Sequence, residues 1–404
     1  MMERNPRAGL LPLYLGLYDD AMPERRKEFE PFLNQVQYGL TDQGINVVKS
    51  DICRTAEEFA AAVALFEKRD VDCIVTLHLA YSPSLEAVEA LVNTDIPLLL
   101  LDTTMDARFG QDVDPERIMY NHGIHGVMDL ASMLRRQKRP FRIVAGHVEG
   151  GALDRAALSV RGAFAARRLR STRSLRVGES FKGMGDFSVE SAVMASVLGI
   201  HVDQVTSADL APDVEAITDA EVQAELEADR ARFVCEVPDD VHARSVRVGL
   251  GVRRRLETGD YSAFSMNFLA FDSGDGPVNV MPFLEASKAM ARGIGYGGEG
   301  DVLTAALVGA LARGFGDTTF TEIFCSDWDG NSLFLSHMGE INPDLAAAKP
   351  VLIEKPFPWT AARNPAVLTC APRQGPGVFV NLVPGPDDTF NLVVAPVHVL
   401  EDTH

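Results

Sequence analysis

The feature that most constrains the fold is an alternation of short apolar runs with longer helical patterns over residues 11–146. The apolar runs predict strands at 11–17, 45–48, 71–78, 96–101 and 141–145. The patterns between them predict helices at 23–40, 55–68, 83–92 and 124–136, the third with Ser82 as its cap. Strands separated by such helices form parallel sheets, because a tight turn cannot join two parallel strands. The sequence therefore predicts an α/β domain at the N-terminus.

A second α/β unit is predicted from about residue 140, and its highly charged segment 219–233 is expected to be a helix with a solvated face. After Thr318 the pattern changes to short β-prone runs broken by Pro and Gly. The predicted fold is α/β, with two Rossmann-like parallel-sheet domains followed by a small antiparallel β-barrel domain. The predicted domains are 1–140, 141–317 and 318–404.

Composition excludes several classes of partner. The formal net charge of −19 argues against general binding to nucleic acid or to anionic membranes, since either would need a positive surface. No apolar run is long enough to cross a membrane. The five cysteines are scattered without a CxxC pair, which is typical of a reducing compartment. We therefore expect a cytoplasmic protein with no nucleic-acid and no membrane partner.

Three side chains with metal-binding or acid/base chemistry fall between residues 295 and 340. Glu299 lies in a glycine-rich stretch that is expected to be a turn before an apolar helix, Glu322 in a β-prone run, and His337 after another. Two carboxylates and an imidazole suit a divalent ion such as Mn²⁺. A Glu before a helix can instead interact with the helix dipole, and a Glu in a strand can face water. Residue types alone leave both interpretations open.

The glycines at 293–298 are not expected to bind a dinucleotide, because the strand, helix and distant acidic residue of that motif are not evident. Walker-type loops are absent from the sequence as well. Phosphate-cofactor chemistry is therefore not predicted.

Three segments resemble the L-arabinose isomerase family: GYGGEGDVLTAALV at 295–308, TTFTEIF at 318–324 and SHMGEINPDL at 336–345. The resemblance implies that Glu299, Glu322 and His337 bind Mn²⁺ or another divalent metal. It also implies that Glu299 and Glu322 are the catalytic residues that transfer protons. The implied activity is that of a ketol isomerase of carbohydrate metabolism, most like the conversion of L-arabinose to L-ribulose.

The same resemblance implies residues that bind the sugar. Asn121 to Gly126 is similar to the family's N-Q-x-x-H-G element, whose His, here His125, reaches the substrate from a neighbouring subunit of a trimer or hexamer. His122 stands where the family usually has Gln, which leaves the identity of the sugar open. Met184 and Phe268 match pocket residues of the family. On residue type alone, the histidines could equally cap and pack a helix start, and Met184 could be a buried turn residue.

One element of the family pattern is not found in this sequence. The family's fourth metal ligand is a histidine in a G-x-H-H element, whereas this sequence ends at His404. Three expectations remain: a shortened chain, replacement by His404, or a three-ligand site with impaired catalysis. One alternative to an L-arabinose isomerase is therefore a sugar-binding homologue. Another, because His122 stands in place of Gln, is an isomerase for a fucose-like or branched aldose.

Overall fold

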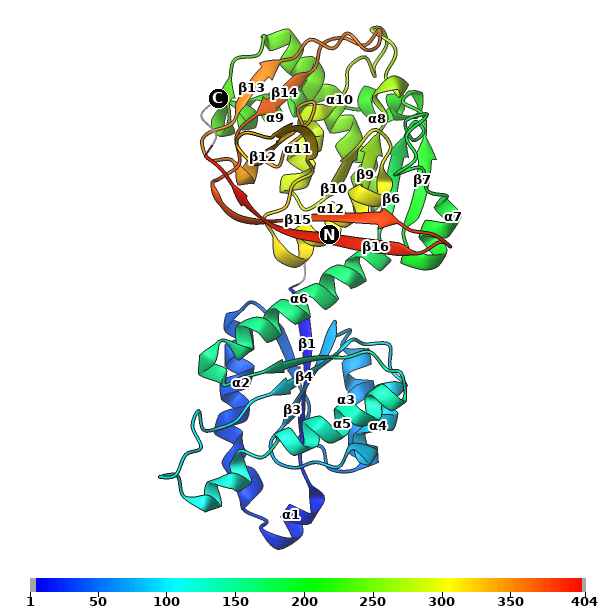
Figure 1. Cartoon of the computed structure of the whole chain (residues 1–404). Helices are drawn as coiled ribbons and strands as arrows, with labels where there is room; N and C mark the ends of the chain where they lie inside the picture. Colours follow the sequence, from blue (N-terminus) through cyan, green and yellow to red (C-terminus); the bar gives the residue numbers. More distant parts are fainter. Residues whose placement is uncertain (1–4, 402–404) are drawn as a thin grey trace. The chain divides into compact units, whose positions relative to one another are not determined.

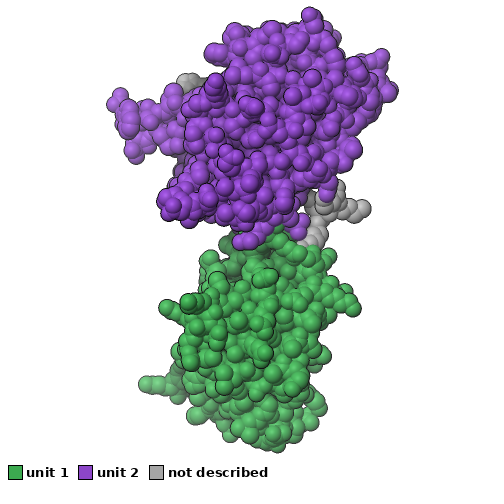
Figure 2. All heavy atoms as spheres, turned by 90° about the vertical axis from the view of Figure 1, so that its right-hand side faces the viewer, with its two compact units in different colours: residues 1–167 green, residues 168–404 purple. Residues whose placement is uncertain are grey.

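The computed structural model describes residues 5–401 and divides into two compact units, residues 1–167 and 168–404 (Figures 1 and 2). The division falls inside helix α6, Ala152–Arg170. The domain boundaries predicted at 140 and 317 stay predictions. Each unit is built on its own parallel sheet and is described separately below.

Unit 1 is organised around a five-stranded parallel sheet of order β2-β1-β3-β4-β5. Its strands are β1 (Arg7–Leu13), β2 (Asn46–Lys49), β3 (Cys73–His78), β4 (Leu98–Asp102) and β5 (Arg142–Ala145). Every residue of β3 is buried. Alternate residues of this strand pack on opposite faces, because Val75 and Leu77 belong to one core cluster and Ile74 to another. Burial on both faces explains why the inner strands β1, β3 and β4 are mostly apolar runs.

Helices cover both faces of this sheet (Figure 1). They are α1 (Gly16–Ala21), α2 (Glu30–Asp42), α3 (Ala56–Lys68), α4 (Ser84–Val92), α5 (Ile124–Arg136) and α6, with 3₁₀ turns at Arg25–Phe29, Pro115–Tyr120 and Val148–Gly150. The prediction that Ser82 caps α4 is wrong. The Ser82 hydroxyl lies 2.8 Å from Nδ1 of the buried His78, and the Ser84 N–H donates to Asp129 at 3.0 Å instead. Tertiary contacts with α5 thus replace a local cap.

Unit 2 contains a four-stranded parallel sheet of order β10-β9-β6-β7. Its strands are β6 (Arg173–Val177), β7 (His201–Val205), β9 (Ala263–Met266) and β10 (Gly295–Gly298). Its helices are α7 (Ser191–Val193), α8 (Ala211–Glu215), α9 (Asp219–Arg232), α10 (Asp239–Thr258), α11 (Phe283–Ala291) and α12 (Val302–Phe315), with a π-helical turn at Met194–Leu198 and 3₁₀ turns at Ala208–Leu210, Phe268–Ala270 and Pro343–Leu345.

The glycine-rich stretch before α12 is a strand, so the expectation of a turn there is wrong for residues 295–298. A Cβ atom on Gly295 would lie 1.9 Å from the carbonyl oxygen of Ala305 in α12. The glycines therefore allow the helix to pack directly against the strand backbone. A strand that was not evident in the sequence thus precedes the expected apolar helix α12, and the Asp301 side chain accepts from the Thr304 N–H at the helix start.

The remaining strands form three small sheets. They are the hairpin β11 (Glu322–Asp327) with β12 (Ser332–Ser336), the sheet of β8 (Val234–Cys235), β13 (Val351–Glu354) and β14 (Ala366–Thr369), and the hairpin β15 (Gly375–Pro384) with β16 (Phe390–Val399). The pairing in both hairpins and between β13 and β14 is antiparallel. The predicted fold class, parallel α/β sheets with additional small antiparallel sheets, is confirmed. Within residues 5–401, no helix combines the length and apolarity needed to cross a membrane.

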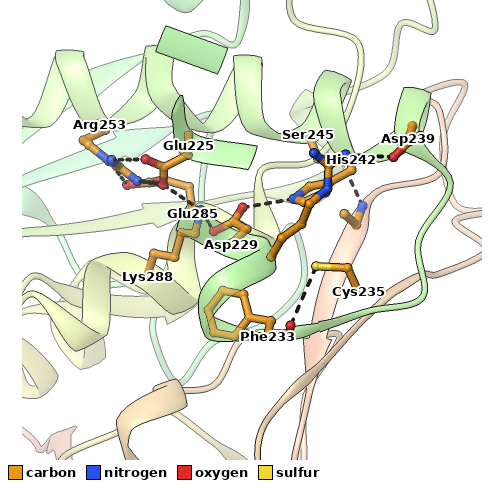
Figure 3. A network of polar contacts seen from close by, with 12 residues as sticks. Glu225, Asp229, Phe233, Cys235, Asp239, His242, Ser245, Arg253, Glu285 and Lys288 are labelled. Atoms are coloured by element: carbon orange, nitrogen blue, oxygen red, sulfur yellow. Dashed lines mark hydrogen bonds and ion pairs between the residues drawn. The ribbon is translucent and has the colours of Figure 1, made fainter. Parts of the chain in front are cut away.

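A buried network of charges joins α9, α10 and α11 (Figure 3). Arg253 of α10 contacts Glu225 of α9 at 2.7 Å and Glu285 of α11 at 2.8 Å. Lys288 of α11 pairs with both Glu225 and Asp229. Asp229 also accepts a hydrogen bond from His242 at 3.0 Å, and both side chains are 2% exposed. The expectation that α9 presents only a solvated charged face is therefore wrong for its inner side.

Candidate active site

Glu299 directly follows β10, at the carboxyl end of the unit 2 sheet, where ligands bind in open α/β sheets. Its φ of 58° lies in the left-handed region, which is uncommon for a residue with a side chain. The buried Ser265 hydroxyl holds this turn, because it accepts from the Gly300 N–H at 2.9 Å and donates to the Gly297 carbonyl at 2.6 Å. The Glu299 carbonyl accepts from the Phe181 N–H at 2.9 Å. The backbone thus aims the Glu299 side chain.

Glu322 and His337 are brought together by the β11–β12 hairpin. Glu322 pairs with Ser336 in the ladder, so His337 follows directly beside it. Their Oε1 and Nε2 atoms are 3.6 Å apart, with the His337 side chain 5% exposed and that of Glu322 45% exposed. The Phe320 ring packs edge-on against the His337 ring at a centroid distance of 4.8 Å. A hairpin register therefore sets one half of the site.

Glu340, which contacts His337, and Tyr296, which contacts Glu340, were not recognised as site residues from the sequence. The Glu340 side chain is fully buried, and its two oxygens accept from the Tyr296 hydroxyl at 2.8 Å and from His337 Nδ1 at 2.7 Å. Burial and, to a smaller extent, the neighbouring Glu340 raise the pKa of Tyr296. The hydroxyl therefore stays protonated and donates a hydrogen bond to Glu340. The sequence signal that could have identified Glu340 was its position three residues after His337, a candidate metal-binding histidine.

The site groups influence one another's protonation. Burial raises the pKa of Glu299 and of Glu322, and the other carboxylates raise it further while His337 opposes the shift. Burial by itself would lower the pKa of His337, but Glu340, Glu322 and Glu299 outweigh it and raise that pKa. Carboxylates with raised pKa values are suited to general acid and base chemistry near neutral pH.

A cavity of about 180 Å³ lies over these groups. Its wall is mostly apolar and includes Met266, Phe268, Met281, Phe283, Met338, Phe357 and Trp359, with Tyr296, Glu299, His337 and Glu340 as the titratable residues. Phe268 stacks on Phe181 with ring centroids 5.6 Å apart and meets Phe357 edge-on at 6.3 Å. A mostly apolar pocket with a few convergent polar groups is the usual form of a small-molecule site.

The structure brings together some of the side chains predicted for the site. Glu299, His337 and Phe268 line one cavity, and Glu322 adjoins His337. Met184 is 44% exposed in a turn in which its N–H donates to the Phe181 carbonyl, and it is not among the lining residues of the cavity. His125 belongs to unit 1. The functional roles of these residues stay predictions, and His404 lies outside the described residues.

His122 uses both ring nitrogens within unit 1. Its Nδ1 donates to the Ile118 carbonyl at 2.6 Å, so its Nε2 accepts from the Tyr18 hydroxyl at 3.1 Å and from the Tyr81 N–H at 3.4 Å. Burial lowers the pKa of His122, which favours this neutral form. A glutamine offers the same combination of one donor and one acceptor. His125, by contrast, is exposed, with its ring 6.5 Å from that of Tyr81.

We expect His122→Gln to leave the stability of the protein within about 0.5 kcal/mol of the wild type. His122→Leu should lower it by about 1–2 kcal/mol, because the Tyr18 hydroxyl and the Tyr81 N–H then lose their acceptor. Thermal and urea unfolding of the two variants measure the difference. Equal stabilities would contradict the proposed donor and acceptor roles of His122.

The donor set fits a divalent cation. Two carboxylates and an imidazole are hard-to-borderline ligands, and the Nδ1 of His337 is already held by a carboxylate, as is usual for metal-binding histidines. His337 Nε2 is therefore the atom left to bind. As the side chains stand in residues 5–401, no three His, Cys, Asp or Glu groups converge closely enough to hold an ion. A change in side-chain conformation would therefore be needed to complete a three-ligand site.

Fold and site together describe an α/β protein in which Glu299 follows the carboxyl end of a parallel strand and lines a cavity with His337, beside which Glu322 lies. Comparison with protein families identifies the L-arabinose isomerase central domain at residues 182–313 and the L-arabinose isomerase C-terminal domain at residues 317–404. These two matches cover more than half of the chain. The chain belongs to the L-arabinose isomerase family.

Several curated relatives are similar over most of their length. L-arabinose isomerase 1 of Bacillus licheniformis is 28% identical over 94% of this chain and 79% of its own. The L-arabinose isomerases of Shouchella clausii and Escherichia coli K12 are each 26% identical, over 98% and 87% of this chain and 81% and 71% of their own. Among solved structures, a solute-binding protein from Agrobacterium vitis bound to α-D-tagatopyranose aligns at 12% identity over 78% of this chain and 90% of its own, but its TM-score of 0.19 carries no structural argument.

Proposed function

We propose that this protein is an aldose–ketose isomerase that converts L-arabinose to L-ribulose and depends on Mn²⁺ or another divalent metal. The observation that carries the proposal is that Glu299 and His337 line one mostly apolar cavity, with Glu322 3.6 Å from His337. The names of the curated relatives support the substrate, since each is an L-arabinose isomerase.

Glu299, Glu322 and His337 are the residues that would hold the metal. A divalent cation supplies Lewis-acid stabilisation of the negative charge that develops on the sugar oxygens. The two carboxylates carry the proton transfers. One of Glu299 and Glu322 removes the C2 proton of the open-chain aldose and returns it to C1, and the other moves the hydroxyl proton from O2 to O1. Both transfers together convert the aldose to the ketose without gain or loss of atoms.

The rest of the cavity serves orientation and exclusion of water. Phe268, Phe357 and Trp359 form an apolar wall beside the titratable groups. Such a wall limits exchange of the transferred proton with solvent and strengthens the electrostatic interactions inside the site. By likeness to the family, we further propose a cytoplasmic homo-oligomer, a trimer or hexamer, in which His125 and Met184 contribute to sugar binding.

A metal-removal experiment tests the proposal. Purified protein is treated with EDTA, dialysed, and assayed with a panel of aldopentoses and deoxyaldohexoses before and after addition of Mn²⁺. We expect ketose formation from L-arabinose to fall to background with EDTA and to return with Mn²⁺, because the Lewis-acid stabilisation of charge on the sugar oxygens is lost with the cation. Among residues 5–401, neither Lys nor Arg lines the cavity to replace it.

The other outcomes separate the alternatives. Metal-dependent turnover of a different aldose would keep the reaction and replace the sugar. Binding of L-arabinose without turnover of any sugar would identify a sugar-binding homologue. Full activity after complete removal of the metal would overturn the metal dependence.

A further inference from the structure

We propose that Glu340 is a positioning residue which, together with Tyr296, fixes the tautomer and the direction of the His337 ring. The inference deepens the proposed function and rests on it for the role of His337 as a metal ligand. Glu340 itself does not touch the substrate or metal in this proposal, since both of its oxygens are already engaged by Tyr296 and His337.

The hydrogen bonds determine which ring nitrogen carries the proton. A carboxylate accepts hydrogen bonds and donates none. The contact of 2.7 Å between Glu340 Oε2 and His337 Nδ1 therefore requires a proton on Nδ1. In the neutral ring, Nε2 then has the free lone pair, and this atom is 3.6 Å from Glu322. Glu340 thus selects the tautomer in which the nitrogen next to the other candidate ligand can bind a cation.

The positioning pair is itself held firmly in the fold. Gly339, which precedes Glu340, has a φ of 134° and packs so closely that a Cβ atom would lie 2.5 Å from the Val367 side chain. Ser287 of α11 donates to the Gly339 carbonyl at 3.3 Å and accepts from the Ile341 N–H at 3.1 Å. The backbone on both sides of Glu340 is thereby tied to a buried helix.

Tyr296 connects this arrangement to the other carboxylate of the site. It lies in β10, three residues before Glu299, and is 1% exposed. Its ring packs edge-on against Phe320, which in turn packs against the His337 ring. The chain of contacts from Tyr296 through Glu340 to His337 therefore joins the strand that carries Glu299 to the hairpin that carries Glu322.

The test compares Glu340→Gln, Glu340→Leu and Tyr296→Phe with the wild type. In the metal-free wild type, at a pH at which the His337 ring is neutral, ¹⁵N NMR of this ring should show a protonated Nδ1 and an unprotonated Nε2. Glu340→Leu removes the acceptor, so we expect a mixture of tautomers and a Kd for Mn²⁺, measured by calorimetry, that rises about 10–100-fold. Glu340→Gln retains an acceptor and should recover part of the affinity, and Tyr296→Phe should weaken binding by less than Glu340→Leu.

A matched control is Glu354→Gln, whose side chain bonds to Asn364 and lies outside the cavity of the active site. It should change neither the ¹⁵N spectrum of His337 nor the Kd for Mn²⁺. If Glu340→Leu does not fold, Glu340→Gln and Tyr296→Phe provide the same two readouts.

An unchanged His337 tautomer together with a Kd for Mn²⁺ within about twofold of the wild type in the folded Glu340 variants would overturn the proposal, since loss of such partners ordinarily costs much more. If the wild type fails to bind Mn²⁺, the metal dependence of the proposed function fails instead. The tautomer measurement in metal-free protein then still decides whether Glu340 positions His337.

Discussion

Glu322→Gln is expected to lower the rate of ketose formation from L-arabinose by about 10²–10⁴-fold, the usual contribution of a general acid or base. The amide has nearly the shape of the carboxylate but cannot accept and return a proton. Glu322 also lies 3.6 Å from His337 and interacts electrostatically with Glu299, so its charge contributes to the proposed metal site as well. Burial disfavours this charge, and its removal is not expected to destabilise the fold.

The measurement is the steady-state rate at saturating sugar and Mn²⁺, with thermal unfolding of the same samples to verify folding. Glu257→Gln, at an exposed position near the end of α10, is the matched control and should retain the wild-type rate. Full turnover by Glu322→Gln would contradict the proposed role of this residue in proton transfer. A large loss of rate in the control would show that the assay responds to unspecific changes.

Glu285→Ala is expected to lower the free energy of unfolding of unit 2 by about 3–5 kcal/mol, the usual cost of breaking a buried ion pair from one side. Glu285 is 3% exposed and accepts two hydrogen bonds from Arg253, at 3.0 and 2.8 Å, as well as a contact from Arg292 (Figure 3 shows the pair with Arg253). Without Glu285, Arg253 retains only one of its two carboxylate partners, Glu225. The charge of this mostly buried side chain is then less well compensated, which destabilises the folded state.

Urea unfolding followed by tryptophan fluorescence measures this effect, because both tryptophans, Trp328 and Trp359, lie in unit 2. Glu227→Ala on the exposed side of α9 is the control, and its effect should stay within about 0.5 kcal/mol. Similar small effects for both variants would show that the network contributes little to stability.

Much of the local structure followed from the sequence. Helix α5 begins and ends at the predicted residues, and helices α3 and α4 end at the predicted residues Lys68 and Val92. These elements are specified by apolar periodicity and by signals within a few residues, which act before any distant contact forms. The proximity of Glu322 to His337 is also local, because both belong to one hairpin.

Other features depended on the tertiary structure. Helix α10 has no counterpart among the elements predicted from the sequence, and the inward-facing charges of α9 become stable only when Arg253 and Lys288 arrive from α10 and α11. The glycines of β10 form a strand because α12 packs against their backbone. Glu340 contacts His337 three residues before it, but its other oxygen accepts from Tyr296, a residue 44 positions away.

The sequence by itself determined the parallel α/β class, because alternating apolar patterns are local. It also singled out Glu299, Glu322 and His337 as candidate ligands, through residue chemistry together with the family resemblance. Only the tertiary structure decided which charges are buried, how closely α12 approaches β10, and which nitrogen of His337 is left free to bind. Burial and hydrogen-bond partners depend on segments that are distant in the chain, and no local pattern encodes them.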